Sequence, residues 1–333
     1  MRILYIYRSM ESGPSIRRVF QPIESRMRDF AEVDSIFLPS PYASFHSLYR
    51  NIRYVLAYVK KHNYDVIHIT GDVYYLAYFL RKYKVVTTVH DLGFYTTAPQ
   101  KTLRTYLQRC IWIKPLKYSS LVTFISEKSR QEALALEELK NTIVIPNAVY
   151  DNYQYAPKKL NDECPVILHL GTKPNKNLLN TIKALSGIEC HLRIIGKIDS
   201  TIEGLLKNYN VNYSNASNLS DDEILDEYKK CDIVSFPSLY EGFGMPIIEG
   251  QAIGRPVLTS NLSPMREIAG GAAVLVNPND VDSIRDGFIK VKEKSEEFVS
   301  KGLKNAVRYR VGEISQQYLQ CYKLLHATTI CKS

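Results

Sequence analysis

The chain has 333 residues, of which 45% are hydrophobic and 23% are charged, so it is long enough for two domains that each bury a core. Its first apolar run, Ile3–Tyr7, is too short for a signal-peptide core, and nothing elsewhere approaches the roughly 18 apolar residues of a membrane span; we expect a cytoplasmic protein, either soluble or held at the inner face of the cell membrane. Six scattered cysteines form no Cys-x-x-Cys pair, which argues against zinc, iron–sulfur and redox-motif proteins.

Positive charge is concentrated in the first half of the chain. Residues 1–150 hold 21 lysines and arginines against 12 acidic residues, whereas residues 151–333 hold 22 of each. Within the first half, the segment 100–117 interleaves Arg104, Arg109, Lys114 and Lys117 with Tyr106, Trp112 and isoleucines, which suits an anionic membrane surface. A solvated helix face over core aromatics explains the segment equally well. No nucleic-acid-binding module accompanies the charge, so we do not expect a nucleic-acid partner.

Short β-branched runs alternate with segments of helical period, which is the pattern of parallel sheets with crossover helices. The strands predicted in the first half are Ile3–Tyr7, Val66–Ile69, Val85–Val89, Leu121–Ile125 and Ile143–Ile145. After the first of these, one helix face is predicted from the spacing of Ile16, Val19, Phe20, Ile23, Met27 and Phe30. The polar stretch from Tyr150 to Cys164 has no clear period and is interpreted as an interdomain linker.

The second half restarts the same alternation. Its predicted strands are Val166–Leu170, Leu192–Ile195, Ile233–Phe236, Val257–Leu258 and Ala273–Val276. Ser220-Asp221-Asp222-Glu223 is a capping box that opens the helix before the third of these. Ligands of such sheets bind beyond the carboxyl ends of the strands, and two facing sheets create a cleft.

The most informative stretch follows the strand that ends at Phe236. A turn with two glycines comes next, and a helix can start near Pro246, where free amides favour phosphate. Glu249 would fall in the first turn of this helix and Glu241 precedes the turn, so two carboxylates can project into one pocket. Carboxylates only accept hydrogen bonds, which suits paired sugar hydroxyls. Glu249 alone would be interpreted as a partner of the helix dipole.

A second motif, His169-Leu-Gly-Thr-Lys173-Pro-Asn-Lys176-Asn, lies at a strand-to-helix corner where lysines can neutralise a diphosphate. Gly171 forms part of this corner, and Lys197 follows the next strand. A basic corner by itself is commonly a surface feature. Together with the two carboxylates it indicates a binding site.

The stretch from Phe236 to Val257, with Ser260–Gly271 and Ala273–Asp280, closely resembles glycosyltransferase family 4, a large retaining family with the GT-B fold. The resemblance extends more loosely over nearly the whole chain. It implies an α/β fold of two Rossmann-like domains that face each other across a cleft. The expected domains are residues 1–155 on the acceptor side and 156–312 for the nucleotide sugar, with a C-terminal helix in 313–333 that can pack back on the first domain.

The resemblance also implies roles for the residues of the main motif. Glu249 would hold the ribose hydroxyls of the donor nucleotide, and Glu241 would lie by the transferred sugar. The backbone that contacts sugar and phosphate would be that of Gly242, Phe243, Gly244 and Met245. Lys176 matches the lysine of the family's Arg-Lys-Asn corner, but Asn175 stands where arginine is usual, so the cation that meets the phosphates stays open between Lys176, Lys173 and Lys197.

Two first-half features resemble the family as well. His90-Asp91 matches a His-Asp corner whose histidine commonly touches the donor sugar; a histidine satisfied in the core is the alternative. The loop around Gly13 occupies the place of a glycine-rich turn near the phosphates and the acceptor, with one glycine instead of two. His90, Lys176 and Glu241 are the predicted catalytic residues.

Asp280-Val-Asp282 matches the Asp-x-Asp metal motif of another glycosyltransferase architecture. It precedes a helical period, however, and is interpreted as a helix N-terminus with capping acids. We therefore expect no metal and no cofactor.

The expected activity is retaining transfer of a hexose from a UDP-sugar or GDP-sugar to a saccharide acceptor, lipid-linked or not, in bacterial surface polysaccharide assembly. Two alternatives stay open. One is another GT-B enzyme, such as a sugar phosphorylase or a sugar-nucleotide epimerase. The other is a non-enzymatic protein that binds charged surfaces.

Overall fold

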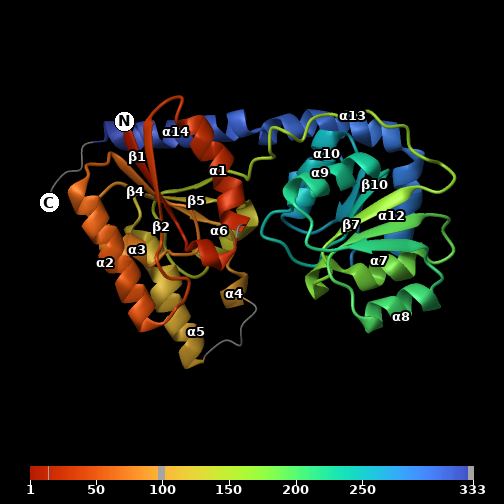
Figure 1. The fold of residues 1–333 in the computed structure, drawn as a ribbon, viewed down its shortest axis with the longest axis horizontal. Coiled ribbons are helices and arrows are strands. Elements are labelled where there is room, and N and C mark those ends of the chain that lie inside the picture. The colour runs from red at the N-terminus through yellow and green to blue at the C-terminus, as the bar shows by residue number, and fades with distance from the viewer. Residues whose placement is uncertain (14, 97–101, 329–333) are drawn as a thin grey trace. The chain divides into compact units, whose positions relative to one another are not determined.

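A computed structural model of the chain describes residues 1–13, 15–96 and 102–328. Its contacts divide into two compact units. Unit 1 comprises Met1–Ala148 and Val311–Ser333, and unit 2 comprises Val149–Arg310. Each unit contains one six-stranded parallel sheet with helices packed on it (Figure 1).

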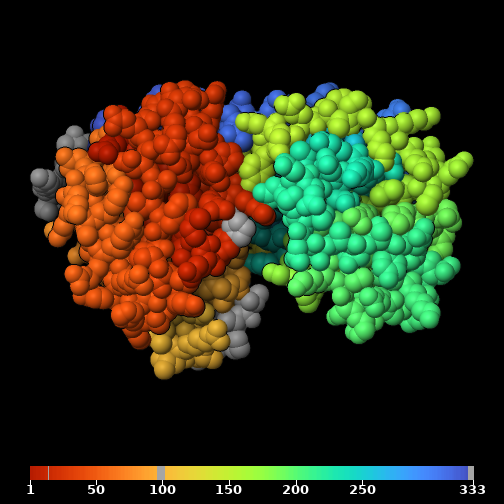
Figure 2. Space-filling view, in the orientation of Figure 1, coloured from red at the N-terminus to blue at the C-terminus, as the bar shows by residue number. Residues whose placement is uncertain are grey.

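The sheet of unit 1 has the strand order β2-β1-β3-β4-β5-β6. Its strands are β1 (Arg2–Tyr7), β2 (Glu32–Phe37), β3 (Val66–Ile69), β4 (Val85–Val89), β5 (Leu121–Phe124) and β6 (Thr142–Val144). The helices are η1 (Met10–Ser12), α1 (Ser15–Met27), α2 (Phe45–Lys61), α3 (Leu76–Phe79), α4 (Gly93–Thr96), α5 (Leu103–Gln108), η2 (Arg109–Ile113), η3 (Lys114–Tyr118), α6 (Glu127–Leu134) and α14 (Val311–Ala327). Central strands such as β3 and β4 are buried at every residue, as expected for a parallel sheet covered on both faces. In the space-filling view, α2 (orange) forms much of the visible surface of this unit (Figure 2).

The predicted helix after β1 is confirmed as α1, with one error at its end. Ile16, Phe20, Ile23 and Met27 are buried on one face. The helix stops at Met27, and Phe30 lies beyond it, 42% exposed. The spacing would put Phe30 on the buried face only if the helix continued for another turn, and it does not.

Helix α14 brings the end of the chain back onto the sheet of unit 1. It packs against α1, and its residues Tyr318 and Tyr322 are fully buried. The hydroxyl of Tyr322 lies 2.6 Å from Nδ1 of His68 in β3 and 3.1 Å from the hydroxyl of Tyr5 in β1. A buried polar cluster thus joins the C-terminal helix to two central strands.

The sheet of unit 2 has the order β12-β11-β10-β7-β8-β9. Its strands are β7 (Val166–Leu170), β8 (His191–Ile195), β9 (Tyr213–Ala216), β10 (Ile233–Phe236), β11 (Val257–Ser260) and β12 (Val274–Val276). The helices are η4 (Pro174–Lys176), α7 (Leu178–Leu185), α8 (Ser200–Asn208), α9 (Asp221–Lys230), α10 (Met245–Ile253), α11 (Met265–Ala269), α12 (Val281–Glu293), α13 (Ser295–Ala306) and η5 (Val307–Tyr309).

Two of the helix starts predicted in the second half are confirmed by their caps. Ser220 and Glu223 form the reciprocal capping box of α9. Asp280 is the N-cap of α12, and its carboxylate accepts from the amides of Asp282 and Ser283. Asp280 is therefore engaged in capping a helix, as the sequence indicated.

No helix in the described part of the chain has both the length and the apolar composition that crossing a bilayer requires.

Candidate functional site

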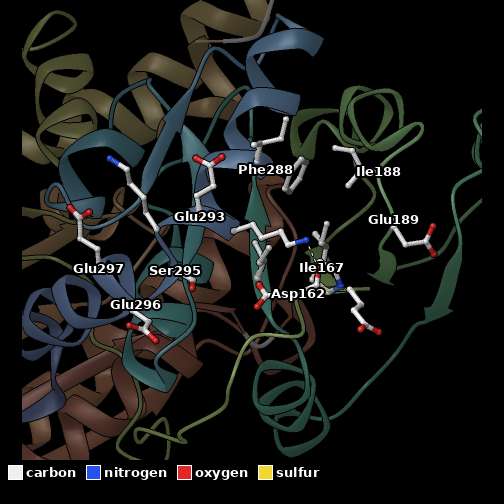
Figure 3. A pocket seen from close by; sticks show the side chains of 15 residues that line it. Asp162, Ile167, Ile188, Glu189, Phe288, Glu293, Ser295, Glu296 and Glu297 are labelled. Carbon is white, nitrogen blue, oxygen red and sulfur yellow. Dashed lines mark hydrogen bonds between the residues drawn. The ribbon is translucent and has the colours of Figure 1, made fainter.

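One pocket of unit 2 lies at the amino edge of its sheet and is unsuited to an anionic ligand. Its volume is about 830 Å³, and its lining includes Ile167 and Ile233, near the starts of β7 and β10. Figure 3 shows Ile167 among the side chains that line it. Two lysines line it, together with the acids Asp162, Glu163, Glu189, Glu293, Glu296 and Glu297. Ligands of parallel sheets bind at the opposite, carboxyl edge.

At the carboxyl edge, the loops after β7 and β10 meet because these strands are neighbours in the sheet. Lys176 Nζ lies 2.7 Å from Glu241 Oε1, and the two side chains are only 22% and 14% exposed. Lys176 Nζ also lies 4.9 Å from the centre of the Phe236 ring. Asn175 Nδ2 donates to the carbonyl of Tyr240 at 3.0 Å. The two loops therefore form one joined polar surface.

Backbone geometry fixes the shape of this corner. Gly171 has φ 92°, and a Cβ there would lie 3.0 Å from Cγ of Lys176, so the lysine side chain lies directly over the glycine. Asn177 adopts the left-handed conformation with φ 62°. Its amide group donates to the carbonyls of Pro237 at 3.0 Å and Pro278 at 2.6 Å. These contacts hold the corner against the loops after β10 and β12.

Helix α10 begins at Met245 with Gly244 as its N-cap, at φ 124°. A Cβ on Gly244 would lie 3.0 Å from Ile247, so both conformation and space favour glycine. The prediction that Glu249 falls in the first turn is wrong: the helix starts one residue before Pro246, which makes Glu249 its fifth residue. The first amides of such a helix have no carbonyl partner within it and favour an anion.

Glu249 is held by a tyrosine that the sequence analysis did not identify. The hydroxyl of Tyr228, in α9, donates to Glu249 Oε2 at 2.6 Å. Burial raises the pKa of Glu249 to about 7, while the tyrosine hydrogen bond and the charge of Lys176 lower it. Burial therefore disfavours the charged carboxylate, and the positive charge of Lys176 favours it.

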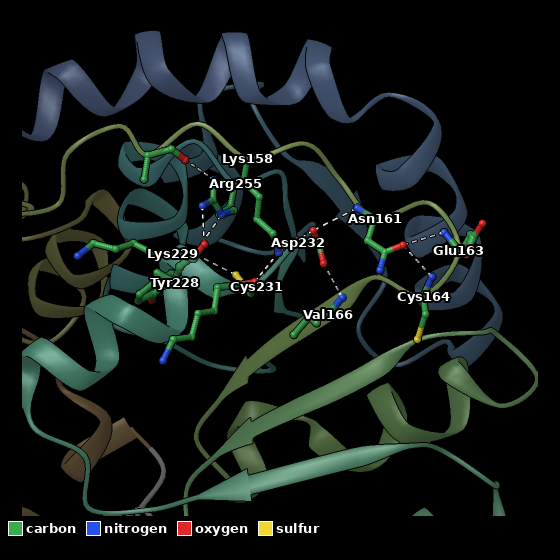
Figure 4. A network of polar contacts seen from close by, with 12 residues as sticks. Lys158, Asn161, Glu163, Cys164, Val166, Tyr228, Lys229, Cys231, Asp232 and Arg255 are labelled. Carbon is green, nitrogen blue, oxygen red and sulfur yellow. Dashed lines mark hydrogen bonds and ion pairs between the residues drawn. The ribbon is translucent and has the colours of Figure 1, made fainter.

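A network of backbone contacts positions Tyr228 (Figure 4). Arg255 is buried, and its guanidinium donates to the carbonyls of Tyr228 at 3.0 Å, Lys229 at 2.7 Å and Ala156 at 2.8 Å. The end of α9 is thereby fixed relative to the start of β11.

The same network bears on the stretch 150–164, which was interpreted from the sequence as an interdomain linker and belongs to unit 2. Lys158 Nζ lies 2.8 Å from the buried carboxylate of Asp232. That carboxylate also accepts from the amides of Asn161 at 3.2 Å and Val166 at 2.8 Å. Because these partners are all in unit 2, the segment is a docked part of that unit. Its polar composition did not reveal the buried acid that binds it.

Two further predicted cations lie at the same edge. Lys173, at the N-cap of η4, and Lys197, just after β8, are both exposed. A Cβ on Gly196 would lie 2.9 Å from the side chain of Thr172, so the corners after β7 and β8 touch. Lys197 therefore lies on a corner that touches the corner carrying Lys173 and Lys176.

The residues after Glu241 contribute backbone rather than side chains. Phe243 is buried, and its ring centre lies 6.0 Å from that of Tyr309. Gly242 and Met245 are half-buried on either side of it. Only the backbone of Phe243 can therefore face a ligand.

In unit 1, His90 follows β4 and is half-buried. Its Nε2 lies 2.8 Å from the carbonyl of Thr70, which can only accept, so the neutral ring carries its proton on Nε2 and Nδ1 is an acceptor. Burial lowers the pKa of His90, partly offset by the Thr70 carbonyl. The ring is therefore neutral at pH 7.

The Gly13 loop is held by a cation that the sequence analysis also missed. Arg8, just after β1, donates to the carbonyl of Gly13 at 3.2 Å and to the hydroxyl of Ser15 at 2.9 Å. It also pairs with Asp72 at 3.1 Å. An arginine directly after a predicted strand and before a glycine loop was the available signal.

Comparison with known proteins extends this description. The sequence matches the family described as "Glycosyltransferase Family 4" over residues 11–152 and that described as "Glycosyl transferases group 1" over residues 154–306. O-antigen chain mannosyltransferase B of Escherichia coli is 26% identical over 286 residues, which cover 77% of this chain and 74% of that protein.

Solved structures share the fold. Sucrose-phosphate synthase from Thermosynechococcus elongatus superposes with a TM-score of 0.82 at 19% identity, covering 99% of this chain and 100% of that one. HepE from Anabaena, solved in complex with UDP and glucose, gives a TM-score of 0.75 at 19% identity, covering 97% and 100%. The predicted GT-B fold is thereby confirmed. The chain belongs to the group 1 glycosyl transferases of glycosyltransferase family 4.

Proposed function

We propose that this glycosyltransferase is a retaining enzyme that transfers a hexose from a nucleoside-diphosphate sugar to a hydroxyl of a saccharide acceptor. The observation that carries the proposal is the ion pair of Lys176 and Glu241, joined across two loops at the carboxyl edge of the unit 2 sheet. The pair adjoins the start of α10, whose amides favour an anion. A cation, a carboxylate and a helix start at one edge suit a phosphate and a sugar that are bound together.

Donor binding divides among three groups of residues. Glu249 Oε2 already accepts from Tyr228, so Oε1 is the oxygen that we expect to accept from the ribose hydroxyls. The diphosphate would lie against the amides of Gly244 and Met245. Because Glu241 offsets the charge of Lys176, we expect Lys173 and Lys197 to supply further positive charge to the phosphates.

The proposed reaction breaks the bond between the anomeric carbon and the diphosphate oxygen. The acceptor oxygen forms its bond to that carbon on the same face, and the acceptor proton passes to the departing phosphate. Lys176 and the start of α10 would stabilise the charge that develops on the leaving group. His90, neutral and with Nδ1 as an acceptor, would receive a hydrogen bond from a sugar hydroxyl. No protein nucleophile is required.

We propose that catalysis needs no metal. Asp280 is the first acid of the Asp-x-Asp sequence. Its carboxylate accepts hydrogen bonds from two backbone amides at the start of α12 and so caps that helix. Lysines and helix amides would supply the positive charge that a metal supplies in the other architecture.

The acceptor and setting follow from the relatives. Two relatives are named as O-antigen chain mannosyltransferases, which supports a role in bacterial surface polysaccharide assembly. We propose a lipid-linked saccharide acceptor, reached at the inner face of the membrane. Leu103 and Tyr106, both exposed on α5, would contact the membrane within the basic segment 100–117.

The test is a panel of UDP-hexoses and GDP-hexoses added to the purified protein, with thermal stabilisation and slow donor hydrolysis as readouts. We expect one donor to stabilise the protein and to be hydrolysed equally well with and without EDTA. NMR of the product formed on a soluble acceptor should show the donor's anomeric configuration. Inversion, strict dependence on a divalent cation, or turnover that requires inorganic phosphate instead of a saccharide would contradict the proposal.

A further inference from the structure

Unit 1 has an apolar groove that its proposed role on the acceptor side does not account for. The groove has a volume of about 710 Å³ and lies between α2, α3 and the turns η2 and η3. Its lining is mainly aromatic and aliphatic, and includes Phe45, Tyr49, Ile52, Tyr78 and Pro115. Phe45 is 83% exposed and Tyr49 is 58% exposed. Covering such exposed apolar side chains with an apolar ligand removes them from water and is therefore favourable.

The rim of this groove is positively charged. Arg53, Lys114 and Lys117 line it. The wall segments 45–61, 73–84 and 102–118 together contain 11 lysines and arginines and no aspartate or glutamate. An apolar floor with a cationic rim complements a ligand that has a hydrocarbon chain and an anionic head.

We propose that this groove binds the hydrocarbon chain of an anionic lipid that carries the saccharide acceptor. The inference rests on the proposed function and deepens it, because it places the lipid on named residues. The hydrocarbon chain of the lipid would lie on Phe45 and Tyr49, and its anionic head would pair with Arg53 and Lys114. A membrane surface, a second copy of this chain and an apolar peptide are the competing occupants.

A hydrogen-bonded path joins the groove wall to the loop at Gly13. Trp112, in the π-helical turn η2 between two groove-lining segments, donates from Nε1 to the carbonyl of Asp72 at 3.0 Å. The carboxylate of Asp72 lies 3.1 Å from Arg8, and Arg8 donates to the carbonyl of Gly13 at 3.2 Å. The groove is thus built onto the same carboxyl edge of the unit 1 sheet as the Gly13 loop, where an acceptor saccharide attached to the lipid would be needed.

The sole tryptophan of the chain, Trp112, makes the proposal measurable in the full-length protein. Dodecyl phosphate, kept below its micelle concentration, would be titrated while tryptophan fluorescence is recorded. We expect a saturable change with one site per chain. Dodecyl maltoside, which lacks the negative charge, should bind at least 10-fold more weakly, and inorganic phosphate alone should give no change.

Three variants separate the groove from the rest of the surface. The double variant Phe45→Ser, Tyr49→Ser removes part of the apolar wall of the groove. The double variant Arg53→Gln, Lys114→Gln removes positive charge from its rim. Each double variant should weaken dodecyl phosphate binding at least 10-fold. The matched control is Leu103→Ser with Leu107→Ser, which removes two exposed apolar side chains of α5 outside the groove. This control should bind dodecyl phosphate like the unaltered protein.

The other outcomes overturn the inference. An equal loss in the control, or binding to anionic vesicles without saturable binding of the monomer, would indicate adsorption to a membrane surface. Loss of a dimer in sedimentation on changing Phe45 and Tyr49 would indicate a second copy in the groove. Donor stabilisation and hydrolysis should persist in all three variants. If the unaltered protein shows neither stabilisation by a donor nor donor hydrolysis, the proposed function itself is rejected.

Discussion

Two ion pairs of unit 2 have nearly the same burial and closest distance but differ in their surroundings. Lys176 and Glu241 are 22% and 14% exposed at 2.7 Å. Arg193 and Glu227 are 21% and 13% exposed at 2.6 Å. The first pair lies between two loops at the carboxyl edge of the sheet, whereas the second joins β8 to α9. Burial and closest distance are therefore matched. The pairs differ in position and in that Arg193 makes two hydrogen bonds to Glu227, whereas Lys176 makes one to Glu241.

The first prediction uses this match. Lys176→Ala should lower kcat/KM for the donor by about 10- to 100-fold, as expected for losing a charge-assisted hydrogen bond of about 1.5–3 kcal/mol. Glu227→Gln, which weakens the matched pair, should lower thermal stability and leave donor kinetics within about twofold. Steady-state kinetics with saturating acceptor and a thermal melt of each variant test this. Equal kinetic losses in both variants would show that the corner acts only through stability.

The second prediction concerns the carboxyl group of Glu249, whose pKa is raised to about 7. Between its ordinary value of 4.5 and 7, the folded protein holds a proton that the unfolded chain has released, so this group's contribution to stability falls as pH rises through that window. Glu249→Gln should therefore raise the melting temperature at pH 8 by about 2–4 °C, equivalent to about 1 kcal/mol, with little change at pH 4.5. The same variant should raise the donor KM 10-fold or more, because an amide presents one acceptor oxygen where the carboxylate has two. An equal shift of the melting temperature at pH 8 and pH 4.5 would show that the raised pKa of Glu249 is not the cause.

The residues proposed to touch a ligand were more visible in the sequence than those that position them. Glu241, Glu249 and Lys176 stood beside glycines and strand ends, where charged residues have few structural uses. Tyr228 lies in the middle of α9, and nothing in its spacing distinguishes it from a core tyrosine. Its role follows only from the hydrogen bond across to α10. Long-range partners of this kind cannot be derived from local pattern.

Edge strands mark the limit of sequence prediction at the scale of elements. All ten predicted strands are present, but β2 and β9 were missed, and both lie at the edges of their sheets. The sequence of β9, Tyr-Ser-Asn-Ala, has no buried residue, and β2 buries only Val33 and Ile36. The other two edge strands, β6 and β12, were predicted because Ile143–Ile145 and Ala273–Val276 are continuous apolar runs. In β2 and β9 polar residues interrupt the apolar ones, so their signal is weak.

The third prediction concerns the junction of α14 with the sheet of unit 1. Tyr322→Phe removes the hydroxyl that contacts His68 and Tyr5, which leaves a buried imidazole nitrogen without that partner. We expect a loss of about 1–3 kcal/mol in the free energy of unfolding. Tyr42→Phe, at an exposed position, is the control and should change little. Urea unfolding followed by circular dichroism measures both, and equal stability of the two variants would mean that the buried cluster contributes nothing.

At the scale of the whole molecule, the chain enters and leaves unit 2 at one place. The amide of Val149 donates to the carbonyl of Tyr309 at 2.7 Å, and Val149 pairs with Arg310 in an isolated parallel bridge. Unit 2 is therefore a continuous insertion, whereas unit 1 is assembled from two segments of the chain. The stability of unit 1 depends on residues at both ends of the sequence.

This organisation leads to the fourth prediction, on how a donor nucleotide stabilises the protein. Calorimetry should resolve two unfolding transitions, since the buried clusters of the two units are separate. A ligand that binds only the folded state at 100 times its Kd adds about 2.7 kcal/mol, and the groups proposed to hold the nucleotide are in unit 2. The nucleoside diphosphate alone should therefore raise the temperature of the unit 2 transition. Glu249→Gln should reduce that rise by about half or more, because a 10-fold weaker Kd leaves about 1.4 kcal/mol of stabilisation. The transition that Tyr322→Phe lowers should stay unchanged. If the nucleoside diphosphate shifts only the transition sensitive to Tyr322→Phe, the nucleotide binds unit 1, and the assignment of Glu249, Lys173 and Lys197 to the donor is wrong.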